Sequence, residues 1–177
     1  KINGKKVHFE FRGKSGIKHE IDLNDPQLAQ IVRRCRDLPG EELFQYLNEA
    51  GEVCDVKSND VNDYLRQISG GDFTAKDFRT WAGTVLCAQA LRKIGPFQTQ
   101  TQAKKNLVQA IGQVAERLGN TKAVCRRCYI HPAIMALYLE GGMQKHQAIR
   151  AGRLRSDEAA VLMILRQAAK SPTRSAA

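Results

Sequence analysis

The spacing of apolar residues changes early in the chain, and this change restricts the fold class more than any other feature. Between residues 7 and 23 apolar and polar residues alternate around a turn bracketed by Gly13 and Gly16, which predicts a β-hairpin with Lys14 at its tip. From Pro26 onward the apolar residues recur at helical spacing. We therefore expect a mainly α protein with a small β-hairpin or sheet at its N-terminal end, an α+β fold.

Cap residues, prolines and glycines divide the rest of the chain into helices. The segment 43–56 is ambiguous and can carry short strands. We expect one domain over residues 1–169 and a loose tail over 170–177. The predicted helices lie in 24–38 with Pro26 at the start, in 58–71 with paired glycine at the end, from Thr74 to 95, from about 102 to 118, in a short segment ending near 129, in 132–139 and from about 157 to 169.

The charge of the chain predicts the kind of partner. Lys and Arg total 28 against 18 Asp and Glu, a net charge of +10. Such an excess favours a polyanion, because each phosphate that Lys or Arg neutralises releases condensed counterions. Nucleic acid is the first candidate and a membrane surface the second. No apolar run approaches the ~18 residues of a membrane span, so we expect a soluble protein. Of the two candidate partners we expect nucleic acid, and no membrane partner.

The five cysteines form an odd set without a spacing framework, which indicates a reducing compartment, best met by the cytoplasm. Cys125 and Cys128 form a Cys-x-x-Cys pair, but no second pair supplies the two further ligands of a zinc site, so we expect no metal. A redox motif would need a preceding strand, whereas a helical segment precedes this pair. The two cysteines are most simply small helix residues.

Helical phase restricts the segment around Tyr129. Asn120 precedes Tyr129 by nine residues, about two and a half turns, so one straight helix would point the two side chains in opposite directions. If both serve one site, the helix must begin after Asn120. The sequence agrees, because Gly119 can end one helix and Thr121 can cap the next.

Two motifs carry a family resemblance. The stretch "TAKDFRTWAGT", followed some forty residues later by "RLGNTKAVCRRCYIHPAI", resembles the catalytic domain of type IB DNA topoisomerases, in the virus-like branch that bacteria also carry. The "FRGKSGIKHEIDL" hairpin resembles the lysine-bearing hairpin of that family, so the resemblance covers roughly residues 1–140. It implies the catalytic-domain architecture shared with tyrosine recombinases. It also implies relaxation of supercoiled duplex DNA through a 3′-phosphotyrosyl intermediate, without ATP or metal. We expect a monomer.

The resemblance assigns roles to four residues. Tyr129 is the nucleophile, Arg79 stabilises charge on the phosphate, and Lys14 is the general acid that protonates the leaving 5′-oxygen. Asn120 stands where many relatives have histidine, and its amide can donate a hydrogen bond to a phosphate oxygen. Further candidate DNA contacts are Lys76, Arg126 and Arg127.

Outside the motifs, each of these residues has a simpler interpretation. Arg79 would be a solvated helix residue, Asn120 a helix cap, Lys14 a polar hairpin tip and Tyr129 a half-buried ring.

Two other functions also stay open. A tyrosine recombinase shares the fold and chemistry, although Lys76 occupies the place where recombinases usually have histidine. A basic DNA-binding module without catalysis would need only the charge and the helices.

One family feature has no counterpart in the sequence. The family has a second catalytic arginine shortly before the lysine hairpin, and Arg12 is too close to Lys14 to be that residue. Because the sequence starts at Lys1 within a strand-like stretch, we expect a fragment of a longer polypeptide. We expect this fragment on its own to be less active than the longer polypeptide, because it lacks the second catalytic arginine.

Overall fold

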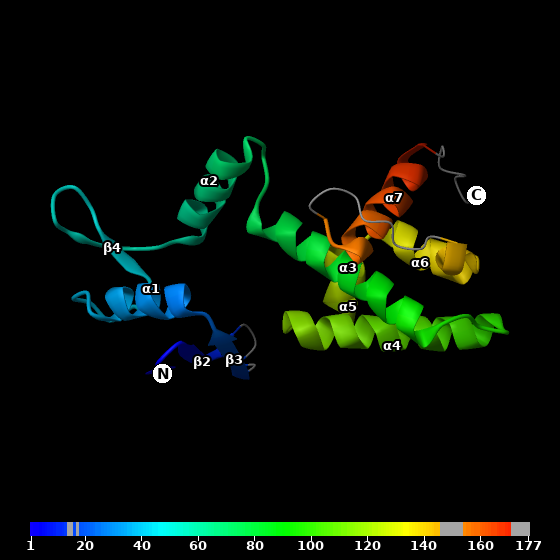
Figure 1. Ribbon diagram of the computed structural model, residues 1–177, viewed down its shortest axis with the longest axis horizontal. Helices are drawn as coiled ribbons and strands as arrows, with labels where there is room; N and C mark the ends of the chain where they lie inside the picture. The colour runs from blue at the N-terminus through cyan, green and yellow to red at the C-terminus, as the bar shows by residue number, and fades with distance from the viewer. Residues whose placement is uncertain (14–15, 17, 146–153, 171–177) are drawn as a thin grey trace. The chain divides into compact units, whose positions relative to one another are not determined.

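The computed structural model of the chain describes residues 1–13, 16, 18–145 and 154–170 (Figure 1). The chain divides into two compact units, residues 1–72 and 73–177. The expectation of a single domain over residues 1–169 stays a prediction. No helix in the described ranges is long and apolar enough to cross a membrane.

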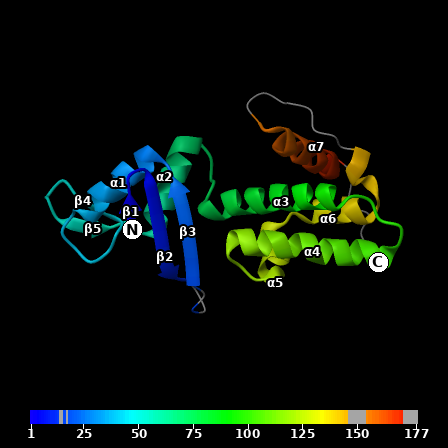
Figure 2. The same ribbon diagram turned by 60° about the horizontal axis from the view of Figure 1, so that its bottom comes forward.

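The first unit begins with the predicted hairpin, which is confirmed. Strands β1 (Ile2–Asn3), β2 (Lys6–Arg12) and β3 (Lys18–Asn24) form an antiparallel sheet in that order (Figure 2). Val7 lies opposite Leu23 in the pairing of β2 with β3. Val7 is buried against Ala29 and Val32 of α1 (Pro26–Arg36). The hairpin tip with Lys14 lies outside the described residues, so its role stays a prediction.

Local signals fix the remaining elements of this unit. The Asp25 carboxylate accepts the backbone N–H groups of Gln27 and Leu28 at 2.8 and 3.0 Å, and so caps α1. The ambiguous segment 43–56 does carry two short paired strands, β4 (Gln45–Leu47) and β5 (Val53–Asp55). Helix α2 (Ser58–Ser69) ends at Gly70, whose φ of 67° is in the left-handed region that glycine tolerates.

The second unit is helical, and its long helices α3 and α4 lie side by side (Figures 1 and 2). Leu91 of α3, Ile111 of α4 and Ile134 of α6 lie in one buried core, which includes residues of α7. The predicted helices are confirmed, with α4 starting two residues early and α7 extending to Lys170. The elements are α3 (Ala75–Ile94), α4 (Gln100–Leu118), α5 (Lys122–Val124), the π-helical turn η2 (Cys125–Tyr129), α6 (Pro132–Leu139), the 3₁₀ turn η3 (Gly142–Lys145) and α7 (Ser156–Lys170).

Helix α3 starts at a capping box. The Asp77 carboxylate accepts from the Thr74 hydroxyl at 2.6 Å and from the Thr74 backbone N–H at 2.9 Å. These hydrogen bonds lower the pKa of Asp77, the bond from the Thr74 side chain having the largest effect. The cap fixes the start of α3, the helix that carries Lys76 and Arg79.

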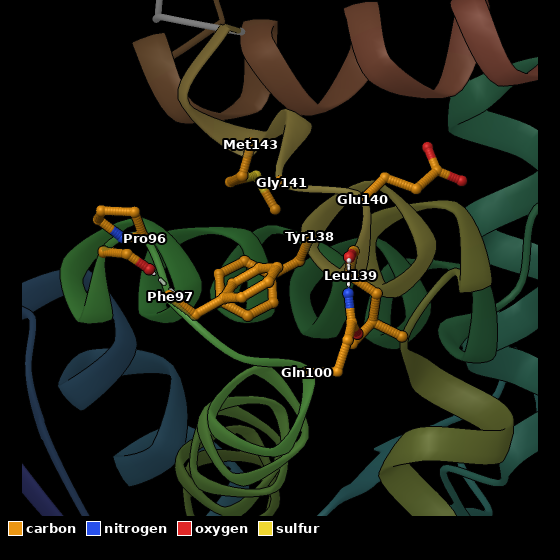
Figure 3. A pocket seen from close by; sticks show the side chains of 9 residues that line it. Pro96, Phe97, Gln100, Tyr138, Leu139, Glu140, Gly141 and Met143 are labelled. Carbon is orange, nitrogen blue, oxygen red and sulfur yellow. Dashed lines mark hydrogen bonds between the residues drawn. The ribbon is translucent and has the colours of Figure 1, made fainter.

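A cavity of about 250 Å³ lies at the opposite end of α3 (Figure 3). Phe97 and Tyr138 line it with their rings 5.4 Å apart, and Gln100 donates to the Leu139 carbonyl beside them. At roughly 1.5 Å of rise per residue, Gly95 on the cavity wall is about 24 Å along the helix from Arg79. The cavity is therefore separate from the residues that the sequence singles out.

Replacing Tyr138 with Phe should destabilise the second unit by about 1–2 kcal/mol. The Tyr138 hydroxyl, on a side chain only 2% exposed, donates to the Gly95 carbonyl at 3.0 Å and accepts from Asn106 Nδ2 at 2.7 Å. Phe keeps the ring, but the Gly95 carbonyl loses its donor and the Asn106 amide loses its acceptor. Urea unfolding measures the change, and Tyr64→Phe, on an exposed ring, should leave the midpoint unchanged. Equal midpoints for Tyr138→Phe and the wild type would contradict the prediction.

Candidate active site

The backbone around Asn120 follows the path that helical phase predicts. Gly119 ends α4 with φ at 62°, and the Asn120 backbone N–H donates to the Ala115 carbonyl at 2.9 Å. Thr121 then caps the next helix, its hydroxyl accepting from the Val124 N–H at 3.2 Å. The prediction that a new helix begins after Asn120 is confirmed.

Tyr129 is the last residue of the π-helical turn η2. The next residue, Ile130, is extended, and so is His131 immediately before Pro132, as the restriction on residues preceding proline requires. Helix formation therefore stops directly after the tyrosine. Its side chain is half-buried, with one face against the helical core.

Arg79, Asn120 and Tyr129 meet at the C-terminal end of α4. Arg79 Nη2 donates to the Leu118 carbonyl at 2.9 Å, and Asn120 Nδ2 donates to the same oxygen at 2.8 Å. The guanidinium carbon of Arg79 also lies 5.0 Å from the centroid of the Tyr129 ring, within the range of a cation–π contact. The structure thus brings together three of the four residues that the sequence predicts.

These contacts leave the two donors with capacity for a phosphate. A guanidinium carries five N–H donors and an amide nitrogen carries two, and each group gives one hydrogen bond to Leu118. Arg79 is exposed, so an anion can approach it from solvent. A phosphate bound here would accept hydrogen bonds from the charged Arg79 guanidinium and the neutral Asn120 amide, next to the Tyr129 phenol. This arrangement is suited to attack on a phosphodiester.

The two cysteines of η2 differ in environment. Cys125 is buried and Cys128 is exposed, and both are free thiols. Burial raises the pKa of Cys125, while the Arg79 charge acts in the opposite direction. Cys125 therefore packs as a neutral residue beneath the site. Among the described residues no group of three or more His, Cys, Asp or Glu side chains could hold a metal ion.

The remaining predicted residues lie around this site or outside the described part. Lys76 is exposed on α3 one turn before Arg79, and Arg126 and Arg127 are exposed on η2 beside Tyr129. Lys14 is not among the described residues. Sequence reasoning missed the Leu118 carbonyl, because a backbone oxygen leaves no signal in the residue pattern.

Comparison with known proteins identifies the family. Residues 1–154 match the family described as eukaryotic DNA topoisomerase I, catalytic core. The chain belongs to this family. A topoisomerase relative, DNA topoisomerase 1B of Acanthamoeba polyphaga mimivirus, is 32% identical over 146 residues, which are 78% of this chain and 43% of the relative. The chain therefore spans less than half the length of that relative. The resemblance to virus-like type IB topoisomerases and the predicted topoisomerase fold class are both confirmed.

Proposed function

We propose that this chain acts as the catalytic core of a type IB topoisomerase, which relaxes supercoiled duplex DNA by cutting and rejoining one strand. The observation that supports it best is the convergence of Arg79, Asn120 and Tyr129. The two donors share the Leu118 carbonyl, and the guanidinium lies over the phenol ring. Family membership supplies the chemical context for this geometry.

The proposed reaction is a reversible transesterification. The Tyr129 oxygen forms a bond to the phosphorus and loses its proton to solvent, while the bond from phosphorus to the 5′-oxygen breaks. The leaving oxygen takes a proton, which we assign to Lys14. Arg79 and Asn120 stabilise the charge that builds on the non-bridging oxygens. The 5′-hydroxyl then attacks the phosphotyrosyl bond, and the DNA strand and the free phenol are restored.

The energy balance explains why the proposed reaction needs no ATP. One phosphodiester is exchanged for another, so the phosphotyrosyl bond conserves the energy required for rejoining. The strand rotates about the intact partner strand between the two steps, driven by the supercoiling itself. The only net change is the number of turns in the duplex.

Relaxation of a supercoiled plasmid tests this function. The plasmid carries no paired recombination sites, and the buffer contains EDTA and no nucleotide. We expect a ladder of topoisomers and no rearranged plasmids. Rearranged or multimeric products would favour a recombinase, and binding without any change in topology over hours would favour a DNA-binding module without catalysis.

Duplex DNA should bind mainly through its phosphates. The net charge of +10 and the exposed Lys76, Arg126 and Arg127 around the site support this. Affinity should fall steeply as the salt concentration rises. In a plot of the logarithm of the binding constant against the logarithm of the salt concentration, replacing any of the three with Ala should reduce the steepness of the slope by about 1. Arg166→Ala, on the exposed face of α7, is the control that should keep the slope. Fluorescence anisotropy measures the affinity for duplex DNA at each salt concentration, and an affinity that does not change with salt would contradict phosphate binding.

We further propose that the chain works as a monomer in a reducing cytoplasm. Five free thiols without a disulfide between them support the reducing compartment. Light scattering of the purified chain tests the monomer, and a concentration-dependent mass would contradict it.

A further inference from the structure

Helix α3 places three small residues against the segment that carries the tyrosine. Thr80, Gly83 and Thr84 follow Arg79 and share one face of the helix, because residues three and four apart are neighbours on a helix. We propose that these three residues form a cradle that positions Tyr129 for attack. The proposal rests on the function proposed above, and the three are positioning residues that act through Tyr129.

Thr84 makes the best-defined contact. It is 1% exposed, and its hydroxyl donates to the Thr80 carbonyl at 2.7 Å. The hydroxyl has only this one proton to donate, so towards His131 it is an acceptor. The Thr84 hydroxyl oxygen accepts a hydrogen bond from the His131 backbone N–H at 3.1 Å. This bond ties the chain two residues after Tyr129 to α3.

Gly83 allows the helix backbone to approach the tyrosine itself. A β-carbon added at Gly83 would lie 2.4 Å from the Tyr129 carbonyl oxygen and 3.2 Å from the Tyr129 β-carbon. The first distance is too short for any side chain, and the atom it meets belongs to the backbone. Glycine inside a helix is less favourable than alanine by about 1 kcal/mol. Its presence here is explained by this close approach.

Thr80 makes the third contact. Its hydroxyl lies 2.9 Å from the Lys76 carbonyl and 3.3 Å from the Cys128 carbonyl, so its one proton serves either oxygen. The Cys128 carbonyl is at the end of η2, where helical hydrogen bonding stops and an oxygen needs another donor. Thr80 therefore places a donor within hydrogen-bonding reach of the backbone carbonyl immediately before Tyr129.

The cradle therefore holds the backbone before, at and after the nucleophile. The same helix holds the ring through Arg79, which also faces the incoming phosphate in the proposed function. Nucleophile and phosphate donor are thus fixed to one rigid element. A displacement of about 1 Å can reduce a rate by a hundredfold, so losing the cradle should slow cleavage more than it weakens DNA binding.

Thr84→Val tests the proposal, because it keeps the shape of the side chain and removes the hydroxyl. Single-turnover cleavage at saturating protein should slow by about 10- to 100-fold, with the dissociation constant for duplex DNA within about twofold of wild type. Thr84→Ser restores the hydroxyl and should recover most of the rate. Tyr138→Phe is the matched control, since it removes a buried hydroxyl from the same unit away from Tyr129 and should cleave normally.

Gly83→Ala is the independent variant, and circular dichroism first establishes that each variant is folded. It should slow cleavage at least as much as Thr84→Val, because the added carbon meets the Tyr129 backbone. If Thr84→Val and Gly83→Ala both cleaved DNA at the wild-type rate, that result would overturn the proposal that the cradle positions Tyr129. So would a rate loss that Tyr138→Phe shares, since that would be a general effect of lower stability.

A second readout separates this inference from the proposed function. Ring resonances of ¹³C-labelled tyrosine, with Tyr129 assigned from its absence in Tyr129→Phe, report the position of the ring under Arg79 without any DNA. We expect the Tyr129 signal to move in Thr84→Val and Gly83→Ala and to return in Thr84→Ser, with Tyr64 unchanged in all three. If the wild type never cleaves DNA, the proposed function fails and the ring signal alone decides the cradle. An unmoved Tyr129 ring would overturn it even in an active enzyme.

Discussion

Tyr129→Phe is expected to abolish the covalent protein–DNA adduct and leave DNA binding nearly unchanged. The substitution removes only the attacking oxygen, and the ring that lies 5.0 Å from the Arg79 guanidinium stays. Adduct formation is measured by denaturing electrophoresis after an SDS stop, and binding by anisotropy at the same salt concentration.

Tyr138→Phe provides the control for this change. It removes a phenol hydroxyl from the same helical unit but from the opposite end of α3, so the variant should form the adduct at the wild-type rate under stabilising conditions. An adduct that survives Tyr129→Phe would place the nucleophile on another residue.

Arg79→Ala should slow single-turnover cleavage by about a hundredfold or more, because a donor to the developing charge is worth that much in rate. It also removes the bond to the Leu118 carbonyl and the contact with the Tyr129 ring. Arg79→Lys should recover only part of the rate. Lysine keeps the charge but lacks the planar fork that contacts a phosphate through two hydrogen bonds.

Arg166→Ala is the matched control for charge, since it removes one exposed arginine from α7 in the same unit. It should leave the cleavage rate within about twofold of wild type. If Arg79→Ala weakened binding but cleaved at the normal rate once protein was saturating, Arg79 would be a binding residue without a role in the transition state.

The sequence predicted the elements where local signals are strong. Pro26 at the start of α1, Thr74 before α3, and Gly119 followed by Thr121 each mark a helix boundary that the structure confirms. Helical phase, together with the hypothesis that Asn120 and Tyr129 serve one site, also required a break between these two residues. These features depend on residues close in the chain, and for that reason they can be read from the sequence.

The contacts that build the site could not be predicted in this way. The π-helical form of η2 has no residue signature, and the meeting of Arg79 with Asn120 at the Leu118 carbonyl joins segments 39 residues apart in the chain. Gly83 did leave a signal, because a glycine inside a helix usually has a packing reason. Its partner, the Tyr129 backbone, is known only from the fold.

The polarity and position of the covalent bond distinguish the proposed reaction from its alternatives. A duplex of random sequence is labelled on the 5′ end of its strands in one preparation and on the 3′ end in another. Both are incubated with the chain for times from milliseconds to hours and stopped with SDS. We predict that the 5′-labelled fragment alone remains attached to protein, and that mass spectrometry of the digested adduct finds the nucleotide on Tyr129. Attachment of the 3′-labelled fragment, or a nucleotide on any other residue, would contradict the proposed reaction.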